Sequence, residues 1–193
     1  MKRMRLALDV RRLAVLIALG GGGVLGSGAA AAEPERYSTP EAADEVLEAS
    51  GLPFALRFAS DQWAVSPQSS KFRLLARVTH EEQPISGAFV YREEEGSEET
   101  VRQRAEEELT TAFASHEVAG FTRRVVNGTP VHFLRASGTT DDGREFVIRN
   151  YYWTGPEGVA DYSLVARRDV FESERGTIME LLNGFEVASA ETE

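Results

Sequence analysis

Three histidines are the side chains best suited by type to acid–base or metal chemistry. His80 is followed by Glu81 and Glu82, and imidazole and carboxylate groups are ordinary ligands of divalent cations. The same residues also suit an exposed hairpin loop that is simply polar. His116 is predicted at the C-terminal end of a helix, where a partly positive side chain complements the helix dipole. His132 lies among apolar residues of a predicted strand, and a general base there needs an orienting partner that the sequence does not identify.

The motifs of the common enzyme classes are absent. There is no G-x-S-x-G nucleophile elbow and no Walker lysine motif, and the glycine-rich stretch 20–28 falls in a predicted signal peptide. The sequence has no cysteine, which excludes disulfides, thiol catalysis and thiolate metal sites. Paired glutamates could serve as glycosidase carboxylates, but they lie mainly on a predicted solvated helix face. We therefore predict no catalytic, cofactor-binding or metal-binding residue.

Charged surfaces are the remaining candidates for function. Glutamates are concentrated between residues 81 and 117, whereas the segment 121–168 carries seven arginines against five acids. Charge runs are usually solvated faces, and that alternative stays open. The arginines could share one sheet face with Tyr151 and Trp153 and bind an acidic partner. The candidate partner-binding residues are Arg123, Arg135, Arg149, Glu93, Glu94 and Glu95.

The N-terminus has the layout of a secretory signal peptide covering residues 1–32. A basic region precedes the short apolar run Leu13–Leu19, and alanines 30–32 offer a cleavage site before Glu33. The apolar run is too short for a stable transmembrane helix. Arg11 and Arg12 also suggest twin-arginine export as an alternative to the general secretory route. Without residues 1–32 the net charge is −14, which disfavours binding to nucleic acid or anionic membranes.

The elements that must position these residues are organised around one helix, predicted over Ser97–Val118. Ser97 is a suitable N-cap, and apolar residues from Val101 to Phe113 recur at three- and four-residue steps. Such a narrow stripe needs a sheet to lie on. Both alternating faces of the strand predicted at 145–154 are apolar, which predicts a sheet covered on both sides.

The other elements follow from local patterns. Residues 33–53 are predicted as a polar leader and a short helix that begins at Ser38 and ends at Gly51. Two short strands at 54–59 and 63–65 precede a hairpin formed by 72–79 and 85–92. After the central helix, strands at 121–126, 131–136, 145–154 and 160–167 form an antiparallel meander, with Asn127-Gly128 as a hairpin turn. A last helix at 171–182 and an acidic tail at 188–193 close the chain.

This order resembles the PsbP-like superfamily. The segments that carry the resemblance are "EETVRQRAEEELTTAF", "VVNGTPVHFLRASGTTDDGREFVIRNYYW" and "YSLVARRDVFESERGTIMELLNGFEV". The superfamily includes the PsbP extrinsic protein of photosystem II, bacterial DcrB-like proteins and a Ran-binding import factor. The resemblance implies one α+β domain at 54–187, a three-layer α/β/α sandwich whose central antiparallel sheet has about six strands covered by helices on both faces. It also implies action by binding or assisting other proteins, with no binding residue that can be carried over.

The sequence therefore favours an exported, non-enzymatic binding or assembly module, periplasmic or secreted, whose partner is another envelope or secreted protein. Two alternatives remain. One is a small periplasmic enzyme or metal-dependent protein that uses His80 or His132, and the other is a carrier of a hydrophobic ligand. The sequence predicts neither the oligomeric state nor the identity of the partner.

Overall fold

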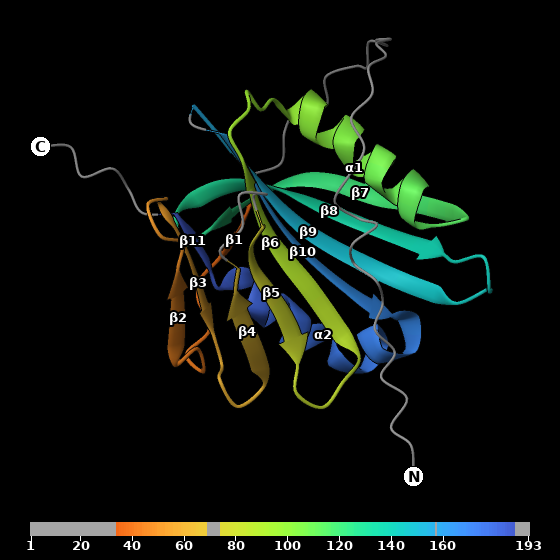
Figure 1. The fold of residues 1–193 in the computed structure, drawn as a ribbon, viewed down its shortest axis with the longest axis horizontal. Coiled ribbons are helices and arrows are strands. Elements are labelled where there is room, and N and C mark those ends of the chain that lie inside the picture. Colours follow the sequence, from red (N-terminus) through yellow and green to blue (C-terminus); the bar gives the residue numbers. More distant parts are fainter. Residues whose placement is uncertain (1–33, 69–73, 157, 188–193) are drawn as a thin grey trace, which may run out of the picture.

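The computed structural model describes residues 34–68, 74–156 and 158–187, so the predicted signal peptide and acidic tail lie outside the described residues. Within these ranges the chain forms an eight-stranded sheet with the order β1-β7-β8-β9-β10-β6-β5-β4 (Figure 1). Its strands are β1 (Glu35–Tyr37), β4 (Trp63–Pro67), β5 (Leu74–His80), β6 (Ile85–Arg92), β7 (Ser115–Val126), β8 (Thr129–Thr139), β9 (Glu145–Gly155) and β10 (Gly158–Arg167). The pair β1–β7 is parallel, and every other pair in this sheet is antiparallel.

A smaller sheet has three strands in the order β11-β3-β2, all antiparallel neighbours. They are β2 (Glu45–Glu48), β3 (Phe54–Phe58) and β11 (Phe185–Val187). Phe54 and Phe185 belong to this small sheet and are buried. Both contact Phe89 of β6, so the small sheet packs against the large one. The two ends of the described chain are thereby brought into a single core.

Helix α1 (Glu98–Ala112) covers one face of the large sheet. The Ser97 hydroxyl accepts the Thr100 backbone N–H and the Thr100 hydroxyl accepts that of Ser97, which confirms Ser97 as the N-cap. Val101, Ala105 and Leu109 form the buried stripe of the helix. They pack against a group of sheet residues that point to this face: Leu134, Ala136, Ile148, Tyr152 and Val159.

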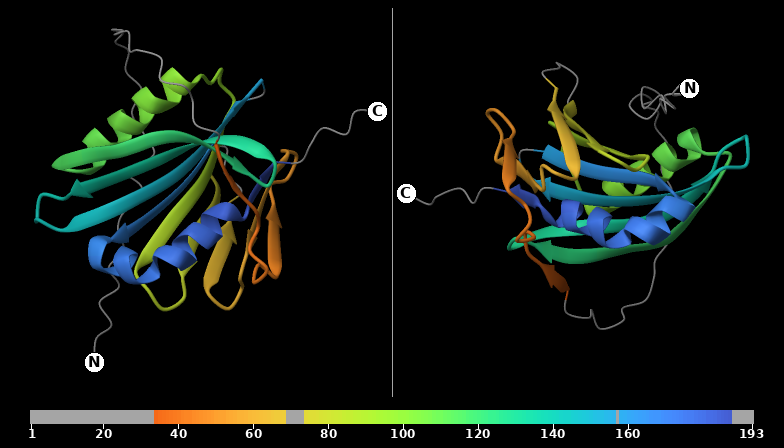
Figure 2. Two further views of the ribbon diagram at one scale, coloured as in Figure 1. Left: turned by 180° about the vertical axis from the view of Figure 1, so that it is seen from behind. Right: turned by 90° about the horizontal axis from the view of Figure 1, so that it is seen from below.

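Helix α2 (Arg168–Asn183) lies on the opposite face, together with the small sheet (Figure 2). Its residues Phe171, Ile178 and Leu182 are buried in the larger of two hydrophobic clusters. Val147 and Tyr151 of β9 point into this cluster, whereas Ile148 and Tyr152 point toward α1. The predicted division of the third meander strand between two apolar faces is therefore confirmed.

The structure confirms an α+β chain with a large sheet, but it differs from the sequence prediction in its count of elements. Among the described residues the large sheet has eight strands rather than about six, and there are two helices rather than three. The four-strand antiparallel meander is confirmed as β7-β8-β9-β10. On the α2 face a three-stranded sheet stands where helices alone were predicted.

The short helix predicted between Ser38 and Gly51 is wrong. The chain instead forms β2, which pairs in register with β3. The Asp44 carboxylate accepts hydrogen bonds from the backbone N–H and the hydroxyl of Ser60, which anchors the start of β2 to the far end of its hairpin. Gly51 does have the left-handed backbone expected of a helix cap (φ 76°), but it serves the turn that joins β2 to β3. Tertiary pairing has overridden a weak local helix signal.

The end of the central helix is also different. Helix α1 ends at Ala112, and residues 115–118, which were predicted as helix, begin β7. The Ala114 N–H donates to the Thr139 carbonyl at 2.9 Å, and Ser115 then pairs with Thr139. His116 therefore lies on a strand and does not complement a helix dipole.

Candidate functional site

A cluster of ionisable groups lies between α1 and strands β6 and β10; Asp161 is buried, and Arg92 and Glu108 are half-buried. The Arg92 guanidinium lies 3.2 Å from the Glu108 carboxylate and 3.8 Å from the Asp161 carboxylate. Ser163 donates to Asp161 at 2.8 Å. Burial, followed by the charge of Asp161, raises the pKa of Glu108 to about 8, and burial also raises the pKa of Asp161 against the opposing effect of Arg92. At neutral pH the folded chain therefore holds a proton that the unfolded chain would release.

This cluster predicts that the free energy of unfolding decreases as the pH rises from 6.5 to 8. A carboxyl group whose pKa is raised on folding stabilises the fold below its unfolded pKa of 4.5, and this stability is lost as the pH approaches the folded value of about 8. Each retained proton accounts for at most about 1.4 kcal/mol per pH unit. Urea denaturation across this range should show a smaller slope for Glu108→Gln than for the wild type. Equal slopes for the two proteins would contradict a proton retained by Glu108 on folding.

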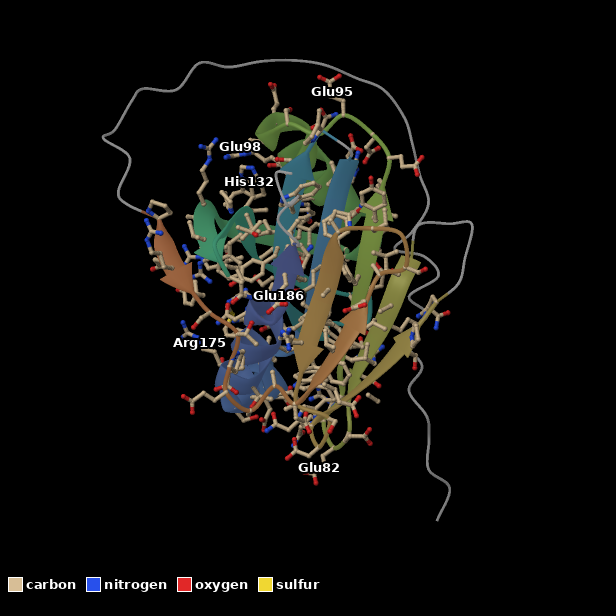
Figure 3. All side chains as sticks on the ribbon, turned by 90° about the vertical axis from the view of Figure 1, so that its left-hand side faces the viewer. Glu82, Glu95, Glu98, His132, Arg175 and Glu186 are labelled. Atoms are coloured by element: carbon tan, nitrogen blue, oxygen red, sulfur yellow. The ribbon has the colours of Figure 1, made fainter. Side chains whose placement is uncertain are left out.

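His132 belongs to a second polar group at the N-terminal end of α1. Arg123 donates to Glu98 at 2.9 Å, whereas the Nδ1 atom of His132 lies 3.9 Å from that carboxylate, which is too far for a hydrogen bond. The imidazole ring stacks on Phe121 at a centroid distance of 5.5 Å. Burial lowers the pKa of His132 against the effect of Glu98, which favours the neutral ring. Figure 3 shows His132 beside Glu98; the contacts are those of a packed aromatic residue.

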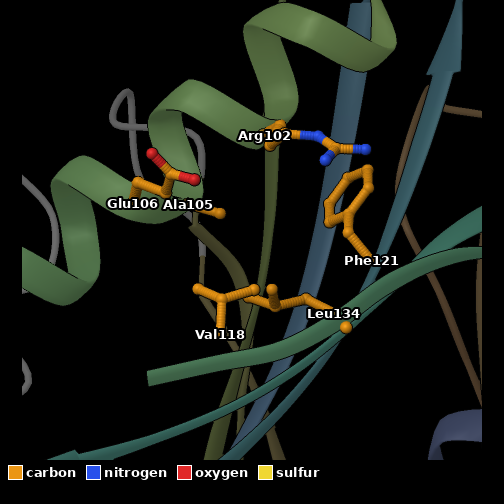
Figure 4. Close-up of a pocket in the computed structure, with 7 residues that line it drawn as sticks. Arg102, Ala105, Glu106, Val118, Phe121 and Leu134 are labelled. Carbon is orange, nitrogen blue, oxygen red and sulfur yellow. The ribbon is translucent and has the colours of Figure 1, made fainter. Parts of the chain in front are cut away.

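A groove separates α1 from strand β7 (Figure 4). Arg102 and Glu106 border it on the helix side, and Val118 and Phe121 on the strand side. Its volume is about 170 Å³, whereas sites for drug-sized ligands occupy about 300–1,000 Å³. The groove therefore has room for a side chain rather than for a lipid or a substrate of ordinary size.

The other two histidines, His80 and His116, lie on other elements than His132 and apart from each other. The Nδ1 atom of His80 accepts the backbone N–H groups of Glu82 and Gln83, each at 3.1 Å, and its ring packs edge-on against Trp63. His80 thus orders the β5–β6 loop. His116 is exposed on β7. Among the residues that the structure describes, no group of three or more histidine, aspartate or glutamate side chains is placed to hold a metal ion.

The predicted acidic surface lies in the segment that leads into α1. Glu93 and Glu95 are exposed, and Figure 3 shows Glu95 projecting from this end of the molecule. Glu94 differs because its carboxylate lies 2.5 Å from the Arg104 guanidinium. Two of the three candidate glutamates are thus available to a partner, while the third connects the loop to the helix.

The three candidate arginines do not share a face, contrary to the prediction. Arg135 of β8 and Arg149 of β9 stand directly opposite each other on the α2 face, the face of Tyr151 and Trp153. Arg123 pairs with His132 across β7 and β8 and contacts Glu98 on the α1 face. The prediction placed the three arginines on one face because the sequence does not give the register of the strands.

Arg175 of α2 joins Arg135 and Arg149 on this face; we call the three the arginine cluster. The guanidinium of Arg149 lies 4.5 Å above the Phe171 ring and donates to the Ile148 carbonyl at 2.8 Å. Burial, followed by repulsion from Arg135 and Arg175, lowers the pKa of Arg149 to about 10. Within the described part of the chain, no carboxylate forms an ion pair with any member of the cluster. The sequence signal for Arg175 was its place in the last helix, but only the packing of α2 reveals its neighbours.

No protein-family model and no curated protein sequence matches the chain. The fold does match solved structures. Cyanobacterial PsbP (CyanoP) from Synechocystis sp. PCC 6803 aligns with a TM-score of 0.55 and 12% identity, over 86% of this chain and 99% of that one. The chain has a PsbP-like fold. The resemblance inferred from the sequence is thereby confirmed at the level of the fold.

Two further structures share the PsbP-like fold with this chain. LpqN, described as involved in cell envelope biogenesis of Mycobacterium tuberculosis, has a TM-score of 0.50 and 14% identity, over 70% of this chain and 83% of LpqN. The Ran-binding protein Mog1p of Saccharomyces cerevisiae has a TM-score of 0.52 and 12% identity, over 75% of this chain and 95% of Mog1p. Identities this low establish the architecture alone. Neither helix of the described structure is long and apolar enough to cross a membrane.

Proposed function

We propose that this chain is an exported, non-enzymatic binding or assembly module that acts through contact with another protein. The observation that carries the proposal is the arginine cluster, whose members form no ion pair with a carboxylate of the described residues, in a chain whose net charge is −10. Cations held together at a cost in electrostatic energy favour an anionic partner. The fold supports this proposal by analogy, because Mog1p is named for binding Ran, another protein.

The place of action that we propose is the cell envelope or the exterior. The support is the signal-peptide layout of residues 1–32, with the general secretory route favoured over the twin-arginine route. LpqN, which shares the fold, is described as involved in cell envelope biogenesis. The proposed architecture is a three-layer one, with α1 on one face of the sheet and α2 and the small sheet on the other.

A tagged copy of the full chain should capture a protein partner from the envelope fraction of the organism that encodes it. We expect capture to weaken as the ionic strength rises, since exposed charges are screened. Charge reversal of an exposed candidate, Arg123→Glu, Arg135→Glu or the pair Glu93→Lys and Glu95→Lys, should weaken capture more than His116→Ala. Thermal melts of each variant would exclude unfolding as the cause.

His116→Ala is the matched control because the His116 side chain is exposed on the same sheet and makes no hydrogen bond to the described residues. If His116→Ala or His132→Ala abolished the biological activity while every charge reversal was silent, the binding module would be the wrong class. The alternative of a small enzyme or metal-dependent protein would then be favoured. The carrier alternative lacks support because the groove beside α1 is too small for a lipid chain.

A further inference from the structure

The arginine cluster is built from three elements that are fixed relative to one another. Arg135 and Arg149 occupy a directly opposed pair of positions on β8 and β9, and Arg175 reaches the same region from α2. Figure 3 shows Arg175 on the outer surface of this helix. Gly120 of β7 makes room for Arg135: a Cβ atom at that position would lie only 2.7 Å from the Arg135 guanidinium. The guanidinium therefore lies across the neighbouring strand.

This arrangement is costly for the isolated protein. Like charges directly opposite each other on adjacent strands destabilise a sheet. The two neighbouring cations, Arg124 and Arg168, already have carboxylate partners, Glu35 at 2.8 Å and Glu145 at 2.5 Å. They add positive potential around Arg149, while Glu35 also attracts Arg135 without forming an ion pair with it. Five arginines of this region thus have two ion-paired carboxylates among them, Glu35 and Glu145, in a chain that is acidic as a whole.

We propose that the arginine cluster binds a carboxylate-rich segment of the partner protein, lying across β8 and β9 beside α2. Guanidinium groups form bidentate, charge-assisted hydrogen bonds with carboxylates. Neighbouring strands lie about 4.8 Å apart, and carboxylates on one face of an extended segment recur about every 7 Å, a spacing that long arginine side chains can span. The inference deepens the proposed function, on which it rests, by naming the chemistry of the partner.

A peptide suits the cluster better than a membrane does. The chain carries a net charge of −10, so an anionic bilayer would repel most of its surface while attracting one small face. Arg135 and Arg175 are exposed and Arg149 is half-buried, so the cluster is an open face. An extended segment can lie along such a face and contact the three guanidinium groups in turn.

The test measures binding of fluorescein-labelled decaglutamate to the full mature chain by fluorescence anisotropy, at about 0.01 M and about 0.1 M salt. The double variant Arg135→Glu, Arg175→Glu should bind at least about tenfold more weakly than the wild type. The matched control is Arg102→Glu, Arg144→Glu, which makes the same change in net charge at solvent-accessible positions on α1 and on the β8–β9 loop. We expect this control to weaken binding by less than about threefold. Arg135→Lys, Arg175→Lys, which retains the charge but loses the planar fork, should fall between the wild type and the charge reversal.

Three results would overturn the inference. They are an absence of decaglutamate binding, an equal loss in the two charge-reversed pairs, and binding to phosphatidylglycerol vesicles in preference to decaglutamate. Melting curves that match the wild type establish that each variant is folded. Envelope capture separates this inference from the proposed function. Capture that persists in Arg135→Glu, Arg175→Glu rejects the site and retains the binding module, whereas cluster-dependent decaglutamate binding without any capture supports the site and rejects the module.

Discussion

Leu109→Asp should unfold the domain. Leu109 is 5% exposed and continues the buried stripe of α1 over the β8 and β9 residues on that face. An aspartate there would bury a carboxylate without a hydrogen-bond partner, which costs several kcal/mol after relaxation. Total stabilities of domains are about 5–15 kcal/mol, so most of the folded population is expected to be lost. Far-UV circular dichroism and a urea titration would measure the loss.

Thr110→Asp is the matched control for this substitution. Thr110 is the next residue of the same helix, and its side chain is exposed, donating only to the Glu106 carbonyl one turn earlier. The control introduces the same charge and should change the free energy of unfolding by less than about 1 kcal/mol. A melting curve for Leu109→Asp that matched the wild type would mean that the buried face of α1 is wrongly assigned.

Elements with a strong local pattern were predicted well from the sequence. The strand predicted at Ile85–Arg92 is found at the same residues, and the N-cap at Ser97 is correct. In both cases the local pattern and the tertiary contacts agree. The helix prediction for Glu45–Glu48 was wrong because the apolar pattern of this segment is short and fits a helix or a strand equally well. Only the presence of β3 as a pairing partner decides between the two, and a local pattern does not contain that information.

The sequence contains part of the information that determines on which face of the sheet each arginine lies. A two-residue turn at Asn127-Gly128 pairs Val126 with Thr129, and it therefore pairs Arg123 with His132 rather than placing it beside Arg135. The register of β8 against β9 was not available, because the longer connection between Thr139 and Glu145 does not fix it. The arginine cluster depends on that second register and on the packing of α2. For this reason Arg175 was not predicted as a binding residue.

The buried acidic cluster was missed for a different reason. Glu108 was grouped with the glutamates of the solvated face of the helix, since its neighbours in sequence are charged. In the structure the Glu108 carboxylate lies 3.2 Å from the guanidinium of Arg92 on β6. That guanidinium also lies 3.8 Å from the Asp161 carboxylate. Asp161 alternates with large buried residues of β10 and looks like an ordinary outward-facing position of a strand. A buried ion cluster requires a partner from a distant element, which periodicity does not reveal.

Asn127→Ala should destabilise the fold by about 4 kcal/mol, more than a surface turn would suggest. The Asn127 side chain accepts the Thr39 backbone N–H at 2.6 Å and donates to the Asn183 and Phe185 carbonyls, each at 2.9 Å. It thus connects the β7–β8 turn to the segment after β1 and to the junction of α2 and β11. Each lost hydrogen bond costs about 1 kcal/mol, and alanine at a φ of 49° adds about 1 kcal/mol of backbone strain.

Asn127→Gly separates these two contributions. Glycine loses the same three hydrogen bonds but adopts a positive φ without strain, so it should destabilise less than alanine by up to about 1 kcal/mol. Both variants keep the backbone hydrogen bond from Asn127 to the Tyr37 carbonyl, so the contact between the turn and β1 should persist. Urea denaturation of the wild type and the two variants measures the differences. A loss below about 0.5 kcal/mol in both variants would show that the three segments are held together without Asn127, because substitutions at ordinary surface positions fall in that range.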